Sequence, residues 1–180
     1  DSSSEQVLPV KHCNGRDWWI ICQNAASEDF YSFLLDTGGI QLNQKVTSKS
    51  GSVHNIDYKL TKRGQLCVSN SGEYIIECTL GRPSQVELHQ FDPSTGMISN
   101  GYDLFDTITT AKNRNELTGA AFSADDSKVY LTGIDTFSTI FQVDLQDPDS
   151  FVVRKRINRI IHQLGFGVGG PVLGRDDRIY

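Results

Sequence analysis

A hairpin pattern that returns about every 50 residues limits the possible folds of this chain more than any other feature of its sequence. Each copy is a short apolar segment, a tight polar turn and a second short apolar segment, as in QLCVS-NSGE-YIIECTL. Residues 68–76 align without a gap on residues 122–130, which lie 54 positions later, and residues 172–180 follow after a further 50. Short apolar runs separated by turn signals are typical of antiparallel strands. We therefore expect a chain built from repeated β-units.

Each repeat carries a second pair of apolar segments, joined by a turn that contains Asp36, Asp92 or Asp144, at spacings of 56 and 52 residues. Asp suits a turn because its carboxylate can accept a hydrogen bond from the backbone two residues on. Four strands in about 50 residues are the content of one β-propeller blade. The sequence thus predicts an all-β fold, a β-propeller of four-stranded antiparallel blades, with about three and a half blades in one partial domain. The expected blades lie near residues 8–52, 60–104 and 117–157, with a partial blade at 168–180.

Helical periodicity is almost absent from the chain. The best candidate, Ile157 to Phe166, places several Ile and Leu side chains on one helical face and is followed by GVGG. Two interpretations of this segment therefore remain, a helical turn and a connection between blades.

Charge and motif content argue against several classes of function. The 180 residues carry a net charge of −5 and a pI near 5.3, which disfavours nucleic acids and anionic membranes as partners. No apolar run is long enough to span a bilayer, so no membrane insertion is expected. The sequence has no CxxC pair, no HExxH spacing and no GxSxG elbow. We expect no metal, no cofactor and no catalytic residue.

Several segments together resemble a known group of propellers. FSADDSKVYLTG resembles the F-S-P-D-G-x-x-L-Y-V repeat of WD-repeat-like propellers, with Ala124 in place of the usual Pro and Asp126 in place of the usual Gly. The segments KHCNGRDWWIICQN, FDPSTGMISN and LGFGVGGPVLGRDDRIY resemble the propeller region of Bacteroidetes surface proteins, the gliding-motility-associated and type IX secretion sorting-domain family. The resemblance covers about residues 8–180. It implies an extracellular or cell-surface protein with a role in binding, adhesion or gliding motility.

The opening segment HCNGRDWWIIC looks like an active site but aligns with a repeat hairpin. Trp18 and Trp19 fall on the central strand of a blade, where successive side chains face opposite sides. We expect both to pack in interfaces between blades, each contributing roughly 3–5 kcal/mol. The alternative is an aromatic platform for a sugar.

The other candidate ligands of a site have simpler interpretations. Asn14 to Asp17 form the tight turn, in which Arg16 pairs locally or with solvent. Cys13 and Cys22 align with Cys67 and Cys78 of the next repeat, so all four are expected to be buried thiols. The four histidines stand apart from one another in the sequence and are expected to be structural or surface residues.

Two classes of function remain. The first is a non-enzymatic secreted or cell-surface module that binds a protein or glycan through loops, because function on a propeller lies in its loops. The candidate loops are Gln23 to Asp29, Leu80 to Glu87 and Gly133 to Thr139, and the expected contact residues are Glu28, Arg82, Asp135 and Phe137.

The second class is a propeller enzyme, such as a lactonase-like hydrolase or a polysaccharide lyase. An enzyme needs carboxylates, histidines or a metal that converge in space, and the sequence shows no clustered set of such groups. Convergence of the histidines and the loop carboxylates at the propeller axis would favour this class.

The repeat count predicts that further blades complete the structure. The last repeat stops at Tyr180, which aligns with Tyr130 in the middle of a strand, so the chain holds three blades and one hairpin. Propellers usually close with about four to eight blades. We expect the remaining blades to come from a longer parent chain or from a second copy of this one.

Overall fold

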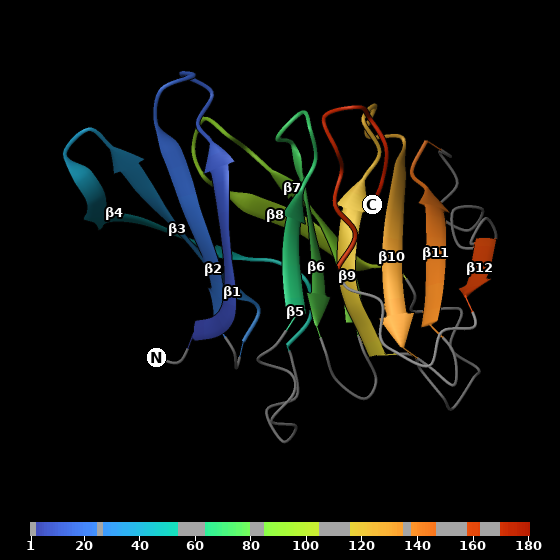
Figure 1. Cartoon of the computed structure of the whole chain (residues 1–180). Helices are drawn as coiled ribbons and strands as arrows, with labels where there is room; N and C mark the ends of the chain where they lie inside the picture. Colours follow the sequence, from blue (N-terminus) through green and yellow to red (C-terminus); the bar gives the residue numbers. More distant parts are fainter. Residues whose placement is uncertain are drawn as a thin grey trace.

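Three four-stranded antiparallel sheets stand side by side in the computed structural model of the chain (Figure 1). The structure describes residues 3–24, 27–53, 64–79, 85–104, 116–134, 138–146, 158–162 and 170–180. Every regular element within these residues is a β-strand, so the prediction of an all-β chain with four-stranded antiparallel blades is confirmed. The described residues contain no helix with the length and apolar character needed to cross a bilayer.

Each sheet is built from four strands that are consecutive in the sequence. Blade 1 consists of β1 (Ser3–Lys11), β2 (Trp18–Asn24), β3 (Asp29–Asp36) and β4 (Gly39–Lys49). Blade 2 consists of β5 (Gly64–Val68), β6 (Tyr74–Thr79), β7 (Gln85–Phe91) and β8 (Ile98–Asp103). Blade 3 consists of β9 (Glu116–Phe122), β10 (Lys128–Ile134), β11 (Ser138–Asp144) and β12 (Asn158–His162). The first strands of the blades, β1, β5 and β9, lie next to one another, as expected around a propeller axis (Figure 1).

The turn between the first two strands has the same hydrogen-bond pattern in all three blades. Its fourth residue is Gly15, Gly72 or Asp126, with φ of +73°, +77° and +55°. Asp tolerates this left-handed region better than most residues. The carboxylate of Asp126 also accepts hydrogen bonds from the backbone amides of Asn70 and Ser71, both at 2.8 Å. The Asp that replaces the usual Gly of the repeat therefore ties the turn of blade 3 to the turn of blade 2.

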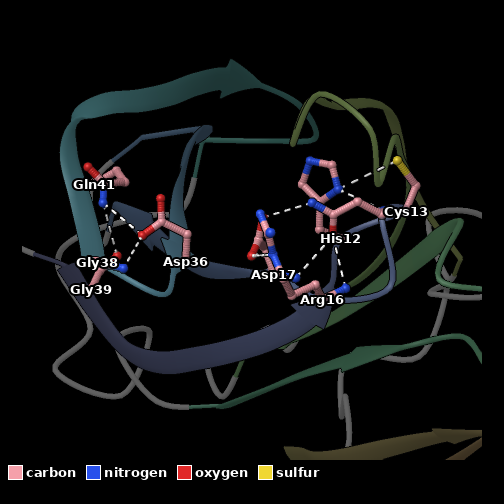
Figure 2. Close-up of polar contacts among 9 residues, drawn as sticks. His12, Cys13, Arg16, Asp17, Asp36, Gly38, Gly39 and Gln41 are labelled. Carbon is pink, nitrogen blue, oxygen red and sulfur yellow. Dashed lines mark hydrogen bonds and ion pairs between the residues drawn. The ribbon is translucent and has the colours of Figure 1, made fainter.

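The three repeated Asp residues act as the sequence predicts. The carboxylate of Asp36 accepts a hydrogen bond from the Gly38 amide at 2.7 Å and one from the Gln41 side chain at 3.0 Å (Figure 2). Asp92 and Asp144 likewise accept from the backbone amide two residues on, at 2.8 and 3.1 Å. Hydroxyl groups of Ser94 and Thr95 also bond to Asp92 and lower the pKa of its carboxyl to about 2.

The apolar core lies between the blades, in two clusters. Because side chains alternate along a strand, each sheet can pack one face on each neighbour. The cluster between blades 1 and 2 contains Leu8, Val10, Trp19, Ile21, Phe30, Leu66, Ile75, Phe91 and Ile98. The cluster between blades 2 and 3 contains Ile76, Cys78, Val86, Leu88, Leu104, Leu117, Ala120, Phe122, Val129, Leu131 and Val143. Blade 2 is thus covered on both faces.

The two adjacent tryptophans differ in burial. Trp19 is 5% exposed in the interface of blades 1 and 2, and its indole N–H donates to the Pro93 carbonyl at 3.0 Å. The prediction of burial is confirmed for Trp19 and wrong for Trp18, which is 42% exposed. The repeated turn aligns Trp18 with Ile75 and Val129, which pack fully buried against the preceding blade. No described sheet precedes blade 1, so Trp18 faces outward.

The prediction of four buried thiols holds only in part. Cys78 is fully buried, and Cys22 and Cys67 are half-buried, so desolvation raises the pKa of all three thiols. Cys13 is exposed, which makes its predicted burial wrong. It lies inside the turn at the position of Asn70, two residues beyond the end of the strand.

The C-terminal third departs from the expected element positions. The segment left open between a helical turn and a connection contains β12, which pairs with β11. The final strand expected near Phe151 lies outside the described residues. Residues 170–180 form a small hairpin in which the backbone groups of Val172 and Tyr180 bond to each other at 2.9 and 3.0 Å.

Replacement of the two tryptophans tests this arrangement. Trp19→Ala should lower the free energy of unfolding by about 3–5 kcal/mol, because a large buried side chain is removed. Trp18→Ala should cost about 1 kcal/mol or less, because a side chain on an open face loses little. Urea denaturation followed by circular dichroism measures both values. Equal losses for the two variants would contradict the assignment of the faces.

Candidate functional site

A buried group of two carboxylates and one imidazole lies in blade 2. Glu77 is on β6 and Glu87 is its direct partner on β7, and His89 follows two residues later on the same face. The side chains of the two glutamates are 1% exposed and that of His89 is 0% exposed. Carboxylates are seldom buried so completely, because removal from water is costly unless other groups compensate for it.

Side chains of blade 1 hold this group from the opposite side of the interface. The Gln23 side chain of β2 donates to Glu77 Oε2 at 2.9 Å. The Ser50 hydroxyl, just beyond β4, hydrogen-bonds with His89 Nδ1 at 2.8 Å. The Ser52 backbone amide donates to Glu87 Oε1 at 3.0 Å, and its hydroxyl donates to the same oxygen. The group therefore belongs to the interface between blades 1 and 2.

Nε2 of the imidazole ring faces both carboxylates. His89 Nε2 lies 3.8 Å from Glu77 Oε2 and 3.8 Å from Glu87 Oε2. This distance is longer than a hydrogen bond. Phe30 packs edge-on against the ring, with centroids 5.0 Å apart, and fixes its plane. Such a set of groups can take up and release a proton or supply ligands to a cation.

Two glycines allow the backbone to approach this group closely. Gly51 has φ of +80°, and a Cβ atom there would overlap the Glu87 carboxylate. A Cβ atom on Gly101 would overlap the His89 ring. Both positions therefore need glycine, since the cluster occupies the space of a side chain.

The group lies near one end of the blades. Strand β6 ends two residues after Glu77, and Ser50 begins the segment that leaves β4 at the same end. The connections from β2 to β3 and from β6 to β7, which the sequence proposes as binding loops, are also at this end.

Only one of the four predicted contact residues lies in the described part of the chain. Glu28 pairs with Lys49 at 3.0 Å, and its own backbone amide together with Lys49 lowers the pKa of its carboxyl. Arg82, Asp135 and Phe137 lie outside the described residues. The predicted binding loops thus remain a prediction.

The segment HCNGRDWWIIC, which looks like an active site in the sequence, begins with a turn whose side chains contact one another. Arg16 pairs with Asp17 at 2.8 Å, and the Asn14 side chain donates to the same carboxylate at 2.8 Å. His12 Nδ1 lies 3.5 Å from Cys13 Sγ and accepts from the Asn14 amide at 3.0 Å (Figure 2). These contacts build the turn, as expected for Arg16.

The sequence indicates no cluster of histidines with carboxylates, and this expectation is wrong for His89. Its structural position in a strand was expected, but its proximity to Glu77 and Glu87 was not. A usable signal exists in the segments YIIECT and VELHQF, where ionisable residues interrupt apolar strands at inward-facing positions. The carboxylates that converge on His89 belong to strands in an interface between blades, and not to loops at the propeller axis.

The space around the group can be tested with a pair of glycine variants. Gly51→Ala should destabilise the protein by about 1–3 kcal/mol from its left-handed backbone, plus a further loss from contact with Glu87. Gly15→Ala is the matched control, because Gly15 has a similar φ of +73° and no atom within 4 Å of an added Cβ. Thermal and urea unfolding compare the two. Equal losses would show that the carboxylate does not fill this space.

Comparison with known proteins supports the fold. No protein-family model matches the chain, and no curated protein sequence matches it. A solved luciferin-regenerating enzyme superposes with a TM-score of 0.55 at 14% identity, over 93% of this chain and 49% of that one. A protein from Bacteroides uniformis, assigned as a 6-phosphogluconolactonase, superposes with a TM-score of 0.59 at 11% identity, over 97% and 45%.

These similarities concern architecture alone, because the identities are low. The chain spans about half the length of either solved structure. Both neighbours have propeller-like folds, so the predicted propeller fold is confirmed. Membership of the Bacteroidetes surface-protein family, with its secretion route and gliding role, stays a prediction.

Proposed function

We propose that this chain is part of a β-propeller hydrolase of the lactonase kind, in which His89, Glu77 and Glu87 supply the acid–base groups. The observation that carries the proposal is the convergence of one imidazole and two carboxylates in a buried interface. The sequence shows no such convergence, and for that reason it favours a non-enzymatic module.

Hydrolysis of a lactone suits these groups chemically. The attacking water must lose a proton as its oxygen bonds to the acyl carbon, and the departing ring oxygen must gain one as the ester bond breaks. A neutral His89 can accept the first proton and deliver it to the alkoxide, which leaves a hydroxy acid. The glutamates, 3.8 Å away, stabilise the imidazolium between these two steps.

The named activities of the structural neighbours support the same class. One neighbour is called a luciferin-regenerating enzyme and the other is assigned as a 6-phosphogluconolactonase. The low identities mean that neither substrate is transferred to this chain.

Access to the acid–base group requires movement of its cover. Ser50 and Ser52 lie over His89 and Glu87 and hydrogen-bond to them, and the side chains beneath are almost completely buried. Opening of the Ser52 contacts with Glu87 would give a substrate carbonyl a way to His89. The proposed reaction therefore includes displacement of this short segment.

A lactone hydrolysis assay tests the proposal. The purified chain should hydrolyse a six-membered sugar lactone faster than buffer alone, as measured by acid release in a pH-stat. His89→Ala should reduce the enzymatic rate by about 100-fold or more. His12→Ala, which changes a histidine in a surface turn, should leave it unchanged. A wild-type rate equal to that of buffer, or a folded His89→Ala variant with full activity, would refute the hydrolase.

A second candidate function, glycan binding, is favoured by a cleft between blades 2 and 3. The cleft has a volume of about 450 Å³, and blade 2 contributes Tyr74, Gln90, Asn100 and Tyr102 to its lining. Tyrosine rings beside amide groups offer a sugar both an apolar surface and hydrogen bonds. Asp126 and Gln146 supply further polar groups from the side of blade 3. The cleft supports a binding function, although none of the contact residues expected from the sequence is part of its lining.

Oligosaccharide binding checks this second function. On a glycan array followed by titration calorimetry, the chain should bind at least one oligosaccharide class, and Tyr102→Ala should weaken that binding about 10-fold or more, since an aromatic contact is lost. Tyr180→Ala, at an exposed tyrosine outside the cleft, should have no effect. Binding that survives Tyr102→Ala would exclude the cleft as the binding site.

A further inference from the structure

We propose that Glu77, Glu87 and His89 together bind one divalent metal ion, Zn²⁺ or Mn²⁺, between blades 1 and 2. The site uses the side chains of the proposed hydrolase, but an ion on His89 Nε2 would occupy the lone pair that accepts the proton, so metal binding and the proposed hydrolysis are separate states of the same group. Metal binding does not depend on that activity.

The spacing of the donor atoms fits ligands of a shared ion. One donor atom from each of the three side chains lies within 4.8 Å of the other two. The imidazole Nε2 is 3.8 Å from an oxygen of each carboxylate, too far for a direct hydrogen bond. Ligands of a tetrahedral zinc with bonds of about 2.1 Å lie about 3.4 Å apart. The two nitrogen–oxygen distances of 3.8 Å exceed this separation by a few tenths of an ångström, and no two of the three donor atoms are more than 4.8 Å apart.

The donor types also indicate which ions the site would accept. Two carboxylates and one imidazole suit Zn²⁺ or Mn²⁺ better than Cu⁺, which prefers sulfur ligands. They suit Ca²⁺ poorly, because calcium takes six to eight oxygen ligands.

The surroundings orient each donor as in known metal centres. Metal-binding histidines commonly bond through their second ring nitrogen to a neighbouring group that fixes the ring. Ser50 takes this position at Nδ1 of His89 and leaves Nε2 toward the carboxylates. Gln23 orients Glu77, and Ser52 orients Glu87. These three contacts come from blade 1, so the bound ion would also fasten blade 1 to blade 2.

The alternative that needs no ion is a protonated His89 shared between the two glutamates. It predicts a cluster that is indifferent to added metal and to chelators. The two possibilities are separated by a binding measurement on the whole chain, without any assay of hydrolysis.

The experiment starts from chain stripped with a chelator and dialysed. After addition of ZnCl₂ and removal of the excess, elemental analysis should find one zinc per chain, and the unfolding temperature should rise with zinc concentration, because the ion binds only the folded state. MnCl₂ is tested in parallel as the second ion. The isosteric variants Glu77→Gln and Glu87→Gln, and His89→Ala, should lose the one-to-one binding and the thermal shift.

A surface pair provides the matched control. His12 Nδ1 and Cys13 Sγ lie 3.5 Å apart in an exposed turn and could bind zinc weakly at the surface. Cys13→Ser should therefore leave the stoichiometry and the thermal shift unchanged. The proposal is overturned if neither ion binds at micromolar concentration, or if folded Glu77→Gln and Glu87→Gln proteins still bind one ion. A chain that binds zinc but hydrolyses no lactone would uphold the metal site and reject the hydrolase.

Discussion

Burial of both faces of each sheet is the constraint on which the rest of this structure depends. A strand places successive side chains on opposite sides, so a sheet that is apolar on both sides needs a neighbour on each. Blade 2 has such neighbours, and its adjacent residues Ile75 and Ile76 pack into different clusters, both fully buried. Blade 1 has a described neighbour on one side only. The exposure of Trp18 is therefore a property of the assembly and not of the strand.

The sequence was sufficient for the blades because their information is local. The tight turn requires a left-handed residue at Gly15, Gly72 and Asp126, and the Asp turns require an acceptor for an amide two positions later. Both signals recur at nearly fixed spacing, so strand order and blade content could be predicted before any tertiary contact was known. The errors concern residues close to these signals. Cys13 was aligned with a strand, although the turn extends over it.

The group of Glu77, Glu87 and His89 could not be predicted in this way, because its geometry depends on a strand pairing and on the packing of two blades. The pairing of Glu77 with Glu87 is set by the length of the β6–β7 connection. Contact with Ser50 and Ser52 is set by how blade 1 packs on blade 2, and this depends on the apolar cluster around Phe30. No local motif records either distance. The sequence does show charged residues in buried strands, and burial of such residues is unfavourable unless other groups hydrogen-bond or pair with them.

Hydrogen bonds from blade 1 stabilise the buried side chains of Glu77, Glu87 and His89, and this dependence also limits their exchange with solvent. Hydrogen bonds from Gln23, Ser50 and Ser52 reduce the cost of burying Glu77, Glu87 and His89 only while blade 1 is docked. Packing and charge are thereby coupled: the apolar cluster brings the donors into place, and the donors make the buried carboxylates tolerable. The same enclosure excludes water, which strengthens every electrostatic interaction within it. A group of this kind is well placed to retain a proton or an ion, and any exchange with solvent must be coupled to local opening of the interface around Ser52.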